Sequence, residues 1–379
     1  MRYNKDAVYF FNYINEVEPL TRETTYNFNA GPSALPTVVL ERAQAQLLDF
    51  EGNGMSIMEM SHRGKVYEAV HNAAIERMRK LYNIPEDYEV IFMQGGASLQ
   101  FSMIPMNFLN EGETAGYVMS GSWSQKALKE AKMQGATYEV ASSKDNQFKN
   151  IPMDWNVEDN TRYIHMTSNN TIYGTQFKDI PEVNVPLIAD MSSDIMSKPV
   201  DVSKFAMIYA GAQKNLGPSG VTVVIVKKDF LETAKEENPT VLQYKTHADS
   251  NSLYHTPPTF GIYMLGEVLK WIEEQGGLEA VDRQNEMKAG LIYDVIDASE
   301  GFYYGHADKD SRSLMNITFR VADEALEKQF LAEAAEAGFV GLNGHRSVRG
   351  CRASAHNPVP VAACEALATF MKEFQAKHA

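Results

Sequence analysis

Short apolar runs that are typical of buried strands alternate with helical segments through the middle of the chain. These runs lie at 89–93, 115–119, 161–166, 187–189, 207–209 and 221–226. Helical spacing of apolar residues is clearest at 65–82 and 261–275. Alternation of this kind predicts a mostly parallel sheet with helices on both faces. We therefore expect an α/β fold.

The chain is too long for a single hydrophobic core. It has 379 residues, which exceeds the size at which one core keeps growing. The glycine pair after the 261–275 pattern is a helix stop signal, and a smaller α+β pattern follows it. We expect an N-terminal extension (1–25), a segment that packs with the small domain (26–40), a large domain (41–279) and a small C-terminal α+β domain (280–379).

Composition and charge argue against several classes of protein. Hydrophobic residues make up 44% and charged residues 22% of the chain, as in ordinary globular proteins. The net charge of -14 argues against nucleic acid and membrane partners, because both require basic surfaces. No apolar run reaches membrane-spanning length, and no signal-sequence pattern opens the chain. The two cysteines form no metal-type pair, so we expect a reducing cytoplasmic location and no metal.

Lys214 stands in a short polar loop between two apolar strand-type runs. Its neighbours are Gln213, Asn215 and a Gly-Pro-Ser-Gly turn, and no carboxylate lies beside it in the sequence. Such surroundings depress the pKa of an ammonium group and free the amine to attack a carbonyl. The alternative is an ordinary lysine in a hairpin turn.

Asp190 ends the apolar run 185–189, which places a carboxylate at the carboxyl end of a buried strand. Sheets of this class bind their ligands at that edge. One partner that fits is the protonated ring nitrogen of pyridoxal phosphate (PLP), which a carboxylate keeps charged. The alternative is a cap of the Ser192-Ser193 turn.

Three further segments carry candidate cofactor ligands. The sequence Gln94-Gly95-Gly96-Ala97-Ser98 follows a strand and opens a helix, so its amides form an anion site unless the turn is only a tight connection. Trp123 lies just past a strand end, either to stack on a cofactor ring or to pack. Thr171 is a turn residue whose hydroxyl also suits a phenolic oxygen.

Three arginines lie outside any helical ladder of charges. They are Arg63, Arg346 and Arg352, and His62 and His345 adjoin two of them. Guanidinium groups can clamp carboxylate and phosphate oxygens with paired hydrogen bonds. In an acidic protein the set indicates an anion-recognising site, although any one of them alone is typical of solvated surface.

In this order, these residues closely resemble the phosphoserine aminotransferase family, whose members are fold-type I PLP enzymes of aminotransferase class V. The resemblance runs from about residue 26 to the C-terminus. The segments that carry it are 27–32, 61–64, 94–98, 208–215, 256–260 and 344–352. It implies a large domain with a mostly parallel, seven-stranded-type sheet flanked by helices, a small C-terminal α+β domain, and a homodimer with shared active sites.

The resemblance also implies a role for each candidate. Lys214 would bear the cofactor and move the substrate proton, Asp190 would pair with the pyridine nitrogen, and Trp123 would stack on the ring. The other cofactor ligands would be Thr171, Gln213, Ala97 and Ser98, with His255 and Thr256 from the second subunit. The substrate ligands would be His62, Arg63, His345, Arg346 and Arg352. His255 departs from the asparagine that is common in the family.

The implied reaction converts 3-phosphohydroxypyruvate and L-glutamate to O-phospho-L-serine and 2-oxoglutarate, a step of L-serine biosynthesis. 4-Phosphohydroxythreonine, of pyridoxine biosynthesis, is a further candidate substrate. The alternatives are another class V enzyme, such as an alanine-glyoxylate-type aminotransferase or a cysteine desulfurase, and a non-catalytic phosphometabolite-binding protein. Neither Cys351 nor Cys364 suits a mobile nucleophile, and a non-phosphorylated substrate would leave Arg346 and Arg352 without a purpose.

Overall fold

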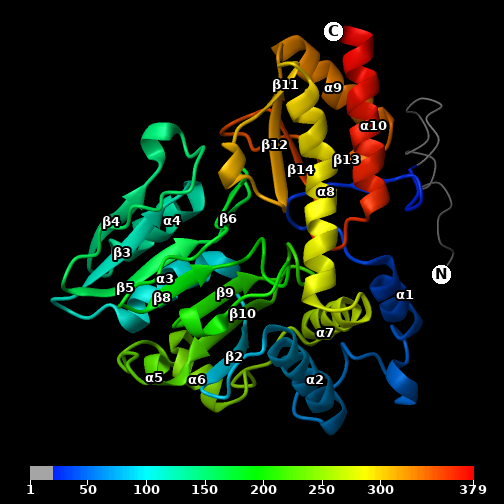
Figure 1. Ribbon diagram of the computed structural model, residues 1–379. Coiled ribbons are helices and arrows are strands. Elements are labelled where there is room, and N and C mark those ends of the chain that lie inside the picture. The colour runs from blue at the N-terminus through cyan, green and yellow to red at the C-terminus, as the bar shows by residue number, and fades with distance from the viewer. Residues whose placement is uncertain (1–19) are drawn as a thin grey trace, which may run out of the picture.

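The computed structural model describes residues 20–379. Most of the predicted N-terminal extension therefore lies outside the described residues. The part of the chain that follows forms one large sheet with helices and a second, smaller sheet (Figure 1). Among residues 20–379, no helix has the length and apolarity needed to cross a membrane.

The large sheet has seven strands in the order β2-β10-β9-β8-β5-β3-β4. Only β10 runs antiparallel to its neighbours, so the predicted mostly parallel α/β sheet is confirmed. The strands are β2 (Tyr88–Met93), β10 (Thr222–Lys227), β9 (Met207–Gly211), β8 (Leu187–Asp190), β5 (Thr161–Thr167), β3 (Thr114–Met119) and β4 (Ala136–Ser142). A two-stranded hairpin, β6 (Asn169–Asn170) with β7 (Thr175–Gln176), lies beyond β5.

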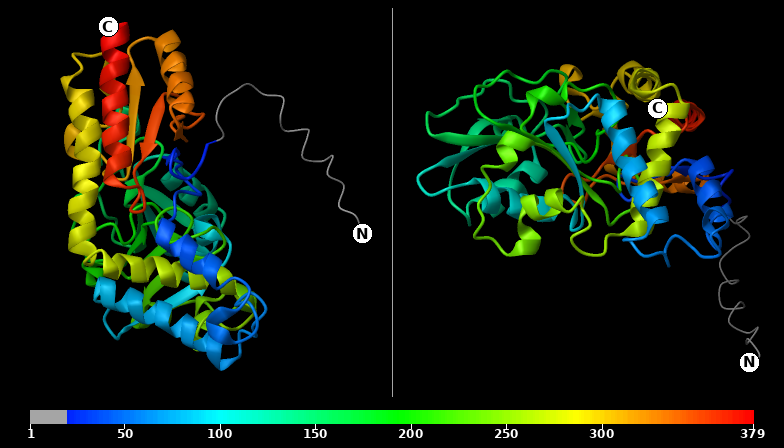
Figure 2. Two further views of the ribbon diagram at one scale, coloured as in Figure 1. Left: turned by 90° about the vertical axis from the view of Figure 1, so that its right-hand side faces the viewer. Right: turned by 90° about the horizontal axis from the view of Figure 1, so that it is seen from below.

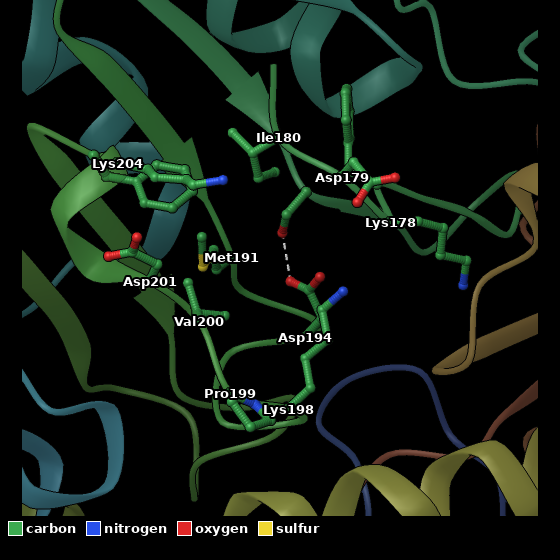
Figure 3. A pocket seen from close by; sticks show the side chains of 13 residues that line it. Lys178, Asp179, Ile180, Met191, Asp194, Lys198, Pro199, Val200, Asp201 and Lys204 are labelled. Atoms are coloured by element: carbon green, nitrogen blue, oxygen red, sulfur yellow. Dashed lines mark hydrogen bonds between the residues drawn. The ribbon is translucent and has the colours of Figure 1, made fainter. Parts of the chain in front are cut away.

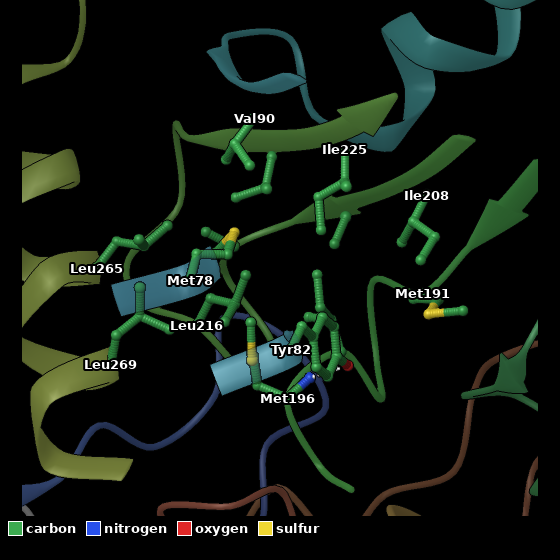
Figure 4. Packing of buried hydrophobic residues seen from close by; sticks show 14 of the residues in the cluster. Met78, Tyr82, Val90, Met191, Met196, Ile208, Leu216, Ile225, Leu265 and Leu269 are labelled. Carbon is green, nitrogen blue, oxygen red and sulfur yellow. Dashed lines mark hydrogen bonds between the residues drawn. The ribbon is translucent and has the colours of Figure 1, made fainter. Parts of the chain in front are cut away.

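The strands are apolar along their length because both faces of the sheet are covered. In β10, Val223 and Ile225 join one hydrophobic cluster, and Val224 and Val226 join another on the opposite face. Figure 4 shows the first cluster, in which side chains of the strands meet those of two helices. The alternating side chains of each strand thus fix the sheet between two helical layers.

Helices cover the two faces of the large sheet. On the first face lie α1 (Thr37–Ala45), α2 (Lys65–Tyr82) and α7 (Thr259–Glu274), and α2 packs along α7. On the second lie α3 (Gly96–Phe108), α4 (Ser122–Ala131), α5 (Lys228–Leu231) and α6 (Tyr244–Asp249). α2 ends at Tyr82 and is capped by Asn83, whose left-handed backbone (φ 47°) closes the last turn.

The C-terminal part builds a second core around an antiparallel sheet of β11 (Tyr303–Gly305), β12 (Asn316–Val321) and β14 (Cys351–Ser354). Its helices are α8 (Leu278–Ala298), α9 (Glu324–Glu336) and α10 (Val361–His378), and α8 and α10 lie side by side (Figure 2). β1 (Tyr26–Asn27) pairs with β13 (Phe339–Val340), which joins the N-terminal segment to this part. The domain boundary at residue 279 stays a prediction.

Helix α8 connects the two cores. Val281 packs in the first cluster of the large sheet, whereas Ala289 and Ile292 pack in the C-terminal core. Between them, Lys288 is 1% exposed and donates from Nζ to the carbonyls of Ala355 (3.0 Å) and His356 (2.8 Å). Burial lowers the pKa of Lys288 to about 8. This lysine fixes the segment that follows β14.

We expect Lys288→Met to destabilise the protein by about 2–3 kcal/mol, because buried carbonyls lose their donor. Arg283→Met is the control, since Arg283 lies on the same helix and is exposed. Urea unfolding followed by far-UV circular dichroism measures both. Equal midpoints for Lys288→Met and the wild-type protein would show that the buried hydrogen bonds contribute nothing.

Candidate active site

The candidate residues gather at the carboxyl ends of parallel strands. Asp190 is the last residue of β8, and Lys214 follows the end of the neighbouring β9. Trp123 lies in the first turn of α4, after β3, and Ser98 lies in the first turn of α3, after β2. Because these strands run in one direction, their loops meet at the same edge of the sheet.

Asp190 is 5% exposed, and its Oδ1 accepts hydrogen bonds from the amide (3.0 Å) and hydroxyl (2.6 Å) of Ser192. The turn interpretation is therefore correct for this oxygen. Burial raises the pKa of Asp190, and the charge of Lys214 is the largest of the effects that lower it. A buried carboxylate and the lysine thus lie close enough to influence one another.

The Lys214 loop is held by the segment before α1. The amide of Ser33 donates to the carbonyl of Gln213 (3.0 Å), and the Ser33 hydroxyl bonds to the carbonyl of Lys214. A methyl group built on Gly31 would lie 3.2 Å from Cγ of Lys214, which is tighter than most side-chain contacts, so the glycine lets the chain pass close to the lysine. Burial lowers the pKa of Lys214, whereas the charge of Asp190 raises it.

Trp123, Thr171 and Arg352 form a connected group beside the lysine. Nε1 of Trp123 donates to Oγ1 of Thr171 (3.0 Å), and Nη1 of Arg352 donates to the Thr171 carbonyl (2.8 Å). Nζ of Lys214 lies 5.2 Å from the centre of the Trp123 ring. Since the Thr171 oxygen accepts from the indole, its own hydrogen remains available for a ligand oxygen.

The Gly95-Gly96 turn has the backbone that the sequence predicts for an anion-binding helix start. Both residues are left-handed (φ 90° and 63°), and a side chain at Gly95 would collide with Leu99 at 2.5 Å. α3 begins at Gly96, so the amides of Ala97 and Ser98 belong to its first turn, where amides lack helical partners. Ser98 is exposed.

His345, Arg346 and Arg352 lie on the connection into β14 and within it. No carboxylate among residues 20–379 forms an ion pair with either arginine, and the buried Nε of Arg352 has no hydrogen-bond partner there. Burial lowers the pKa of His345, and the charges of Arg352, Arg346 and Lys126 lower it further. The region therefore carries uncompensated positive charge.

Four predicted site residues lie apart from this group. Within residues 20–379, no hydrogen bond, ion pair or aromatic contact joins His62, Arg63, His255 or Thr256 to the Lys214 group. His255 packs against His247 at 5.7 Å between ring centres, and Arg63 is exposed before α2. A single chain does not bring all the predicted ligands together through these contacts.

The sequence interpretation missed several residues near the site. Lys126 follows Trp123 by one helical turn, and that i, i+3 spacing was the available signal. His356 is fully buried, and burial, followed by the charge of Lys214, lowers its pKa to about 3. Nothing in the sequence indicated that the Ser33 hydroxyl bonds to the loop that carries Lys214.

A second buried carboxylate, Asp194, lies in the loop after β8. It bonds to the hydroxyl of Ser168 and to Nε2 of Gln176 (3.1 Å). Asp194 borders a cavity of about 170 Å³ that is also lined by lysines and aspartates (Figure 3). Because protein donors bond to both carboxylate oxygens, its contribution to the Lys214 group is the charge that raises the pKa of the lysine.

Comparison with known proteins agrees with this geometry. The family model described as "Aminotransferase class-V" matches residues 25–363, and the chain belongs to this family. It is 68% identical to the phosphoserine aminotransferase of Lysinibacillus sphaericus over 94% of this chain and 99% of that protein. The resemblance inferred from the sequence is thereby confirmed.

Two solved structures are similar over nearly the whole chain. Phosphoserine aminotransferase from Bacillus circulans subsp. alkalophilus has a TM-score of 0.93 and 59% identity, with coverage of 94% of this chain and 100% of that one. PLP-bound phosphoserine aminotransferase from Trichomonas vaginalis has a TM-score of 0.88 and 38% identity, with coverage of 92% and 99%. The chain is therefore a PLP-dependent aminotransferase of fold type I.

The residues present fit this cofactor. The aldehyde of PLP reacts with a neutral amine. Burial lowers the pKa of Lys214 and so increases the neutral fraction of its amine. A pyridine nitrogen requires a buried carboxylate, which Asp190 supplies at the same edge of the sheet. A phosphate requires free amides at a helix start, which the Gly95-Gly96 turn provides.

We expect Lys214 of the cofactor-free protein to be methylated by formaldehyde and cyanoborohydride at lower pH than the exposed Lys129, because only its neutral amine reacts. In Asp190→Asn the Lys214 profile should move to still lower pH, since the charge that raises its pKa is gone. Peptide mass mapping across pH measures both lysines. Coincident profiles, or an upward shift in Asp190→Asn, would contradict the assigned electrostatics.

Proposed function

We propose that the protein transfers the amino group of L-glutamate to 3-phosphohydroxypyruvate and gives O-phospho-L-serine and 2-oxoglutarate, a step of L-serine biosynthesis. The observation that carries this proposal is the cluster of His345, Arg346 and Arg352 without carboxylate partners beside the Lys214 group. Uncompensated cations favour a substrate with a strongly anionic end. The names of the most similar relatives support the same substrate.

Each candidate ligand of PLP has a proposed role. Lys214 bonds covalently to the cofactor, Asp190 holds a proton at the pyridine nitrogen, and Trp123 stacks on the ring. The remaining ligands hold the phenolic oxygen and the phosphate: Thr171, Gln213, Ala97 and Ser98, with the partner subunit's His255 and the partner subunit's Thr256. When bound, PLP stabilises negative charge that develops on the α-carbon of the substrate.

Lys214 is the proposed acid and base. Once an amino substrate had displaced it, Nζ of Lys214 would take the proton from the α-carbon of the substrate and deliver it to the former aldehyde carbon of the cofactor. A pKa lowered by burial increases the neutral fraction that can accept this proton. Asp190 would have the opposite effect at the pyridine nitrogen, because its negative charge would keep that nitrogen protonated.

Two sets of basic residues orient the substrate. Arg63, with His62, binds the α-carboxylate that all four reactants share. His345, Arg346 and Arg352 bind the phosphate, whose charge near pH 7 is about -1.5 to -2. The side-chain carboxylate of glutamate takes the same place. 4-Phosphohydroxythreonine offers the same two anionic ends and is a second proposed substrate.

The protein is proposed to act as a homodimer. Within residues 20–379, His62, Arg63, His255 and Thr256 make no hydrogen bond or ion pair with the Lys214 group, and we assign them to the site of a second chain. The segment before His62 exposes large apolar side chains, including Leu48 (87%), Met55 (43%) and Met58 (53%). Exposed apolar residues of this kind are typical of subunit contacts. A cytoplasmic location, with both cysteines reduced, completes the proposal.

The rival class V activities fit the site less well. Desulfurase chemistry requires a thiolate, but burial raises the pKa of Cys351 far above its ordinary value and that of Cys364 to about 11. An alanine-glyoxylate-type substrate would place a methyl group or a hydrogen among the cations that we assign to phosphate. A non-catalytic binding module would need neither Lys214 nor Asp190.

We expect Arg346→Ala to lower kcat/KM for phosphoserine by about a hundredfold, because a charge-assisted hydrogen bond to the phosphate is lost. Arg349→Ala should change it less than twofold, since Arg349 instead lies 3.6 Å from Glu324. The readout is single-turnover conversion of the PLP absorption band with phosphoserine, glutamate and alanine. A wild-type protein that alanine converts as efficiently as phosphoserine would contradict the proposed substrate.

Mixed dimers test the shared site. Lys214→Ala and Arg63→Ala are each expected to be inactive, but refolding them together should restore about a quarter of the wild-type activity. Half of the molecules are then mixed dimers, and each has one intact site if Arg63 acts across the interface. Tagged variants purified in two affinity steps isolate the mixed species. Absence of restored activity would place Arg63 and Lys214 of each site in one chain.

A further inference from the structure

Lys126 is a surface lysine of α4 that faces the candidate site. It follows Trp123 by three residues, which puts both side chains on the same side of the helix. Its Nζ lies 4.2 Å from the centre of the Trp123 ring, within the range of a cation-π contact. No carboxylate among residues 20–379 forms an ion pair with it. Its charge is therefore free to act on a ligand.

The same tryptophan ties Lys126 to Arg352. Nε1 of Trp123 donates to the hydroxyl oxygen of Thr171, and Arg352 donates to the carbonyl of that threonine. Lys126 thus contacts Trp123, Arg352 contacts Thr171, and a hydrogen bond joins the tryptophan to the threonine. The buried Nε of Arg352 still has no hydrogen-bond partner in the described part of the chain. A ligand that enters between these groups would satisfy an unused donor.

The charges around His345 support this arrangement. Besides burial, the groups that lower the pKa of His345 are Arg352, Arg346 and Lys126, so all three cations act on one imidazole. Like charges gathered without a carboxylate destabilise one another. An anion bound among them removes that cost. The charge of the anion then decides how much is gained, because Coulomb energy scales with charge.

We propose that Lys126 is a specificity residue that favours a phosphate over a carboxylate at the distal end of the substrate. The inference rests on the proposed function, since it concerns the same subsite. Guanidinium forks orient either anion, whereas the lysine acts as a point charge that needs no particular geometry. Phosphate carries nearly twice the charge of a carboxylate and gains nearly twice as much from it. One subsite can thus accept glutamate and still prefer phosphoserine.

Calorimetric titration of the PLP-loaded protein with 3-phosphoglycerate and glutarate tests this inference without turnover. These ligands end in a phosphate and a carboxylate, and neither has an amino or keto group to react. In Lys126→Met we expect the Kd of glutarate to rise about threefold and that of 3-phosphoglycerate about ninefold. The interaction free energy is proportional to the charge of the anion, so doubling that charge squares the factor by which Kd changes. Lys126→Arg should stay within about threefold of wild type, and 0.5 M salt should reduce the difference.

Lys129→Met is the matched control, because Lys129 is exposed one turn further along the same helix. It should leave both dissociation constants unchanged. Equal losses for the two ligands in Lys126→Met, or no loss for either, would overturn the inference. A wild-type protein that binds glutarate as tightly as 3-phosphoglycerate would instead count against the phosphate subsite itself, so the two failures are distinguishable.

Discussion

The electrostatic attraction between the buried Asp190 and the half-buried Lys214 is the constraint on which the rest of the site depends. Two charged groups at the end of a sheet are costly unless each offsets the other or a ligand replaces the lost water. The sheet brings them together because β8 and β9 are parallel neighbours that end at the same edge. Ser33 then bonds to the lysine loop, and Gly31 lets the chain pass close to it. Burial lowers the pKa of this amine, and the neutral form that results is the reactive one.

The second requirement is that the arginines keep a fixed distance from that amine, although they belong to another core. Buried hydrogen bonds that include Lys288 of α8 satisfy this requirement. Lys288 holds the carbonyls of residues 355 and 356, and the amide of Asn357 donates to Oδ1 of Asn215 (2.9 Å), next to Lys214. β14, which carries Arg352, leads directly into this segment. The strand that carries Arg352 and the lysine loop are thus joined through buried hydrogen bonds.

Much of the fold could be predicted from the sequence, because buried strands have continuous apolar runs and helices have a visible period. β4 was missed since it is a half-exposed edge strand, and the antiparallel direction of β10 leaves no mark in composition. Asp190 caps the turn that the sequence offered as one alternative, and Thr171 lies in a turn, whereas their roles at the site stay predictions. Lys288 had no signal, because a lysine on a helix is normally solvated, and the only signal for Lys126 was its i, i+3 spacing from Trp123. The placement of His255 and Arg63 at the site stays a prediction, because within residues 20–379 neither contacts the Lys214 group.

The most direct test of the central claim is to load the protein with PLP, reduce it with borohydride, and locate the modified lysine by peptide mass mapping. Reduction makes the bond between cofactor and amine permanent. We expect one pyridoxyl group per chain, on Lys214, and prior incubation with phosphoserine should prevent the labelling. Modification spread over exposed lysines, or an unmodified Lys214, would contradict the assignment of this half-buried amine as the cofactor-binding residue.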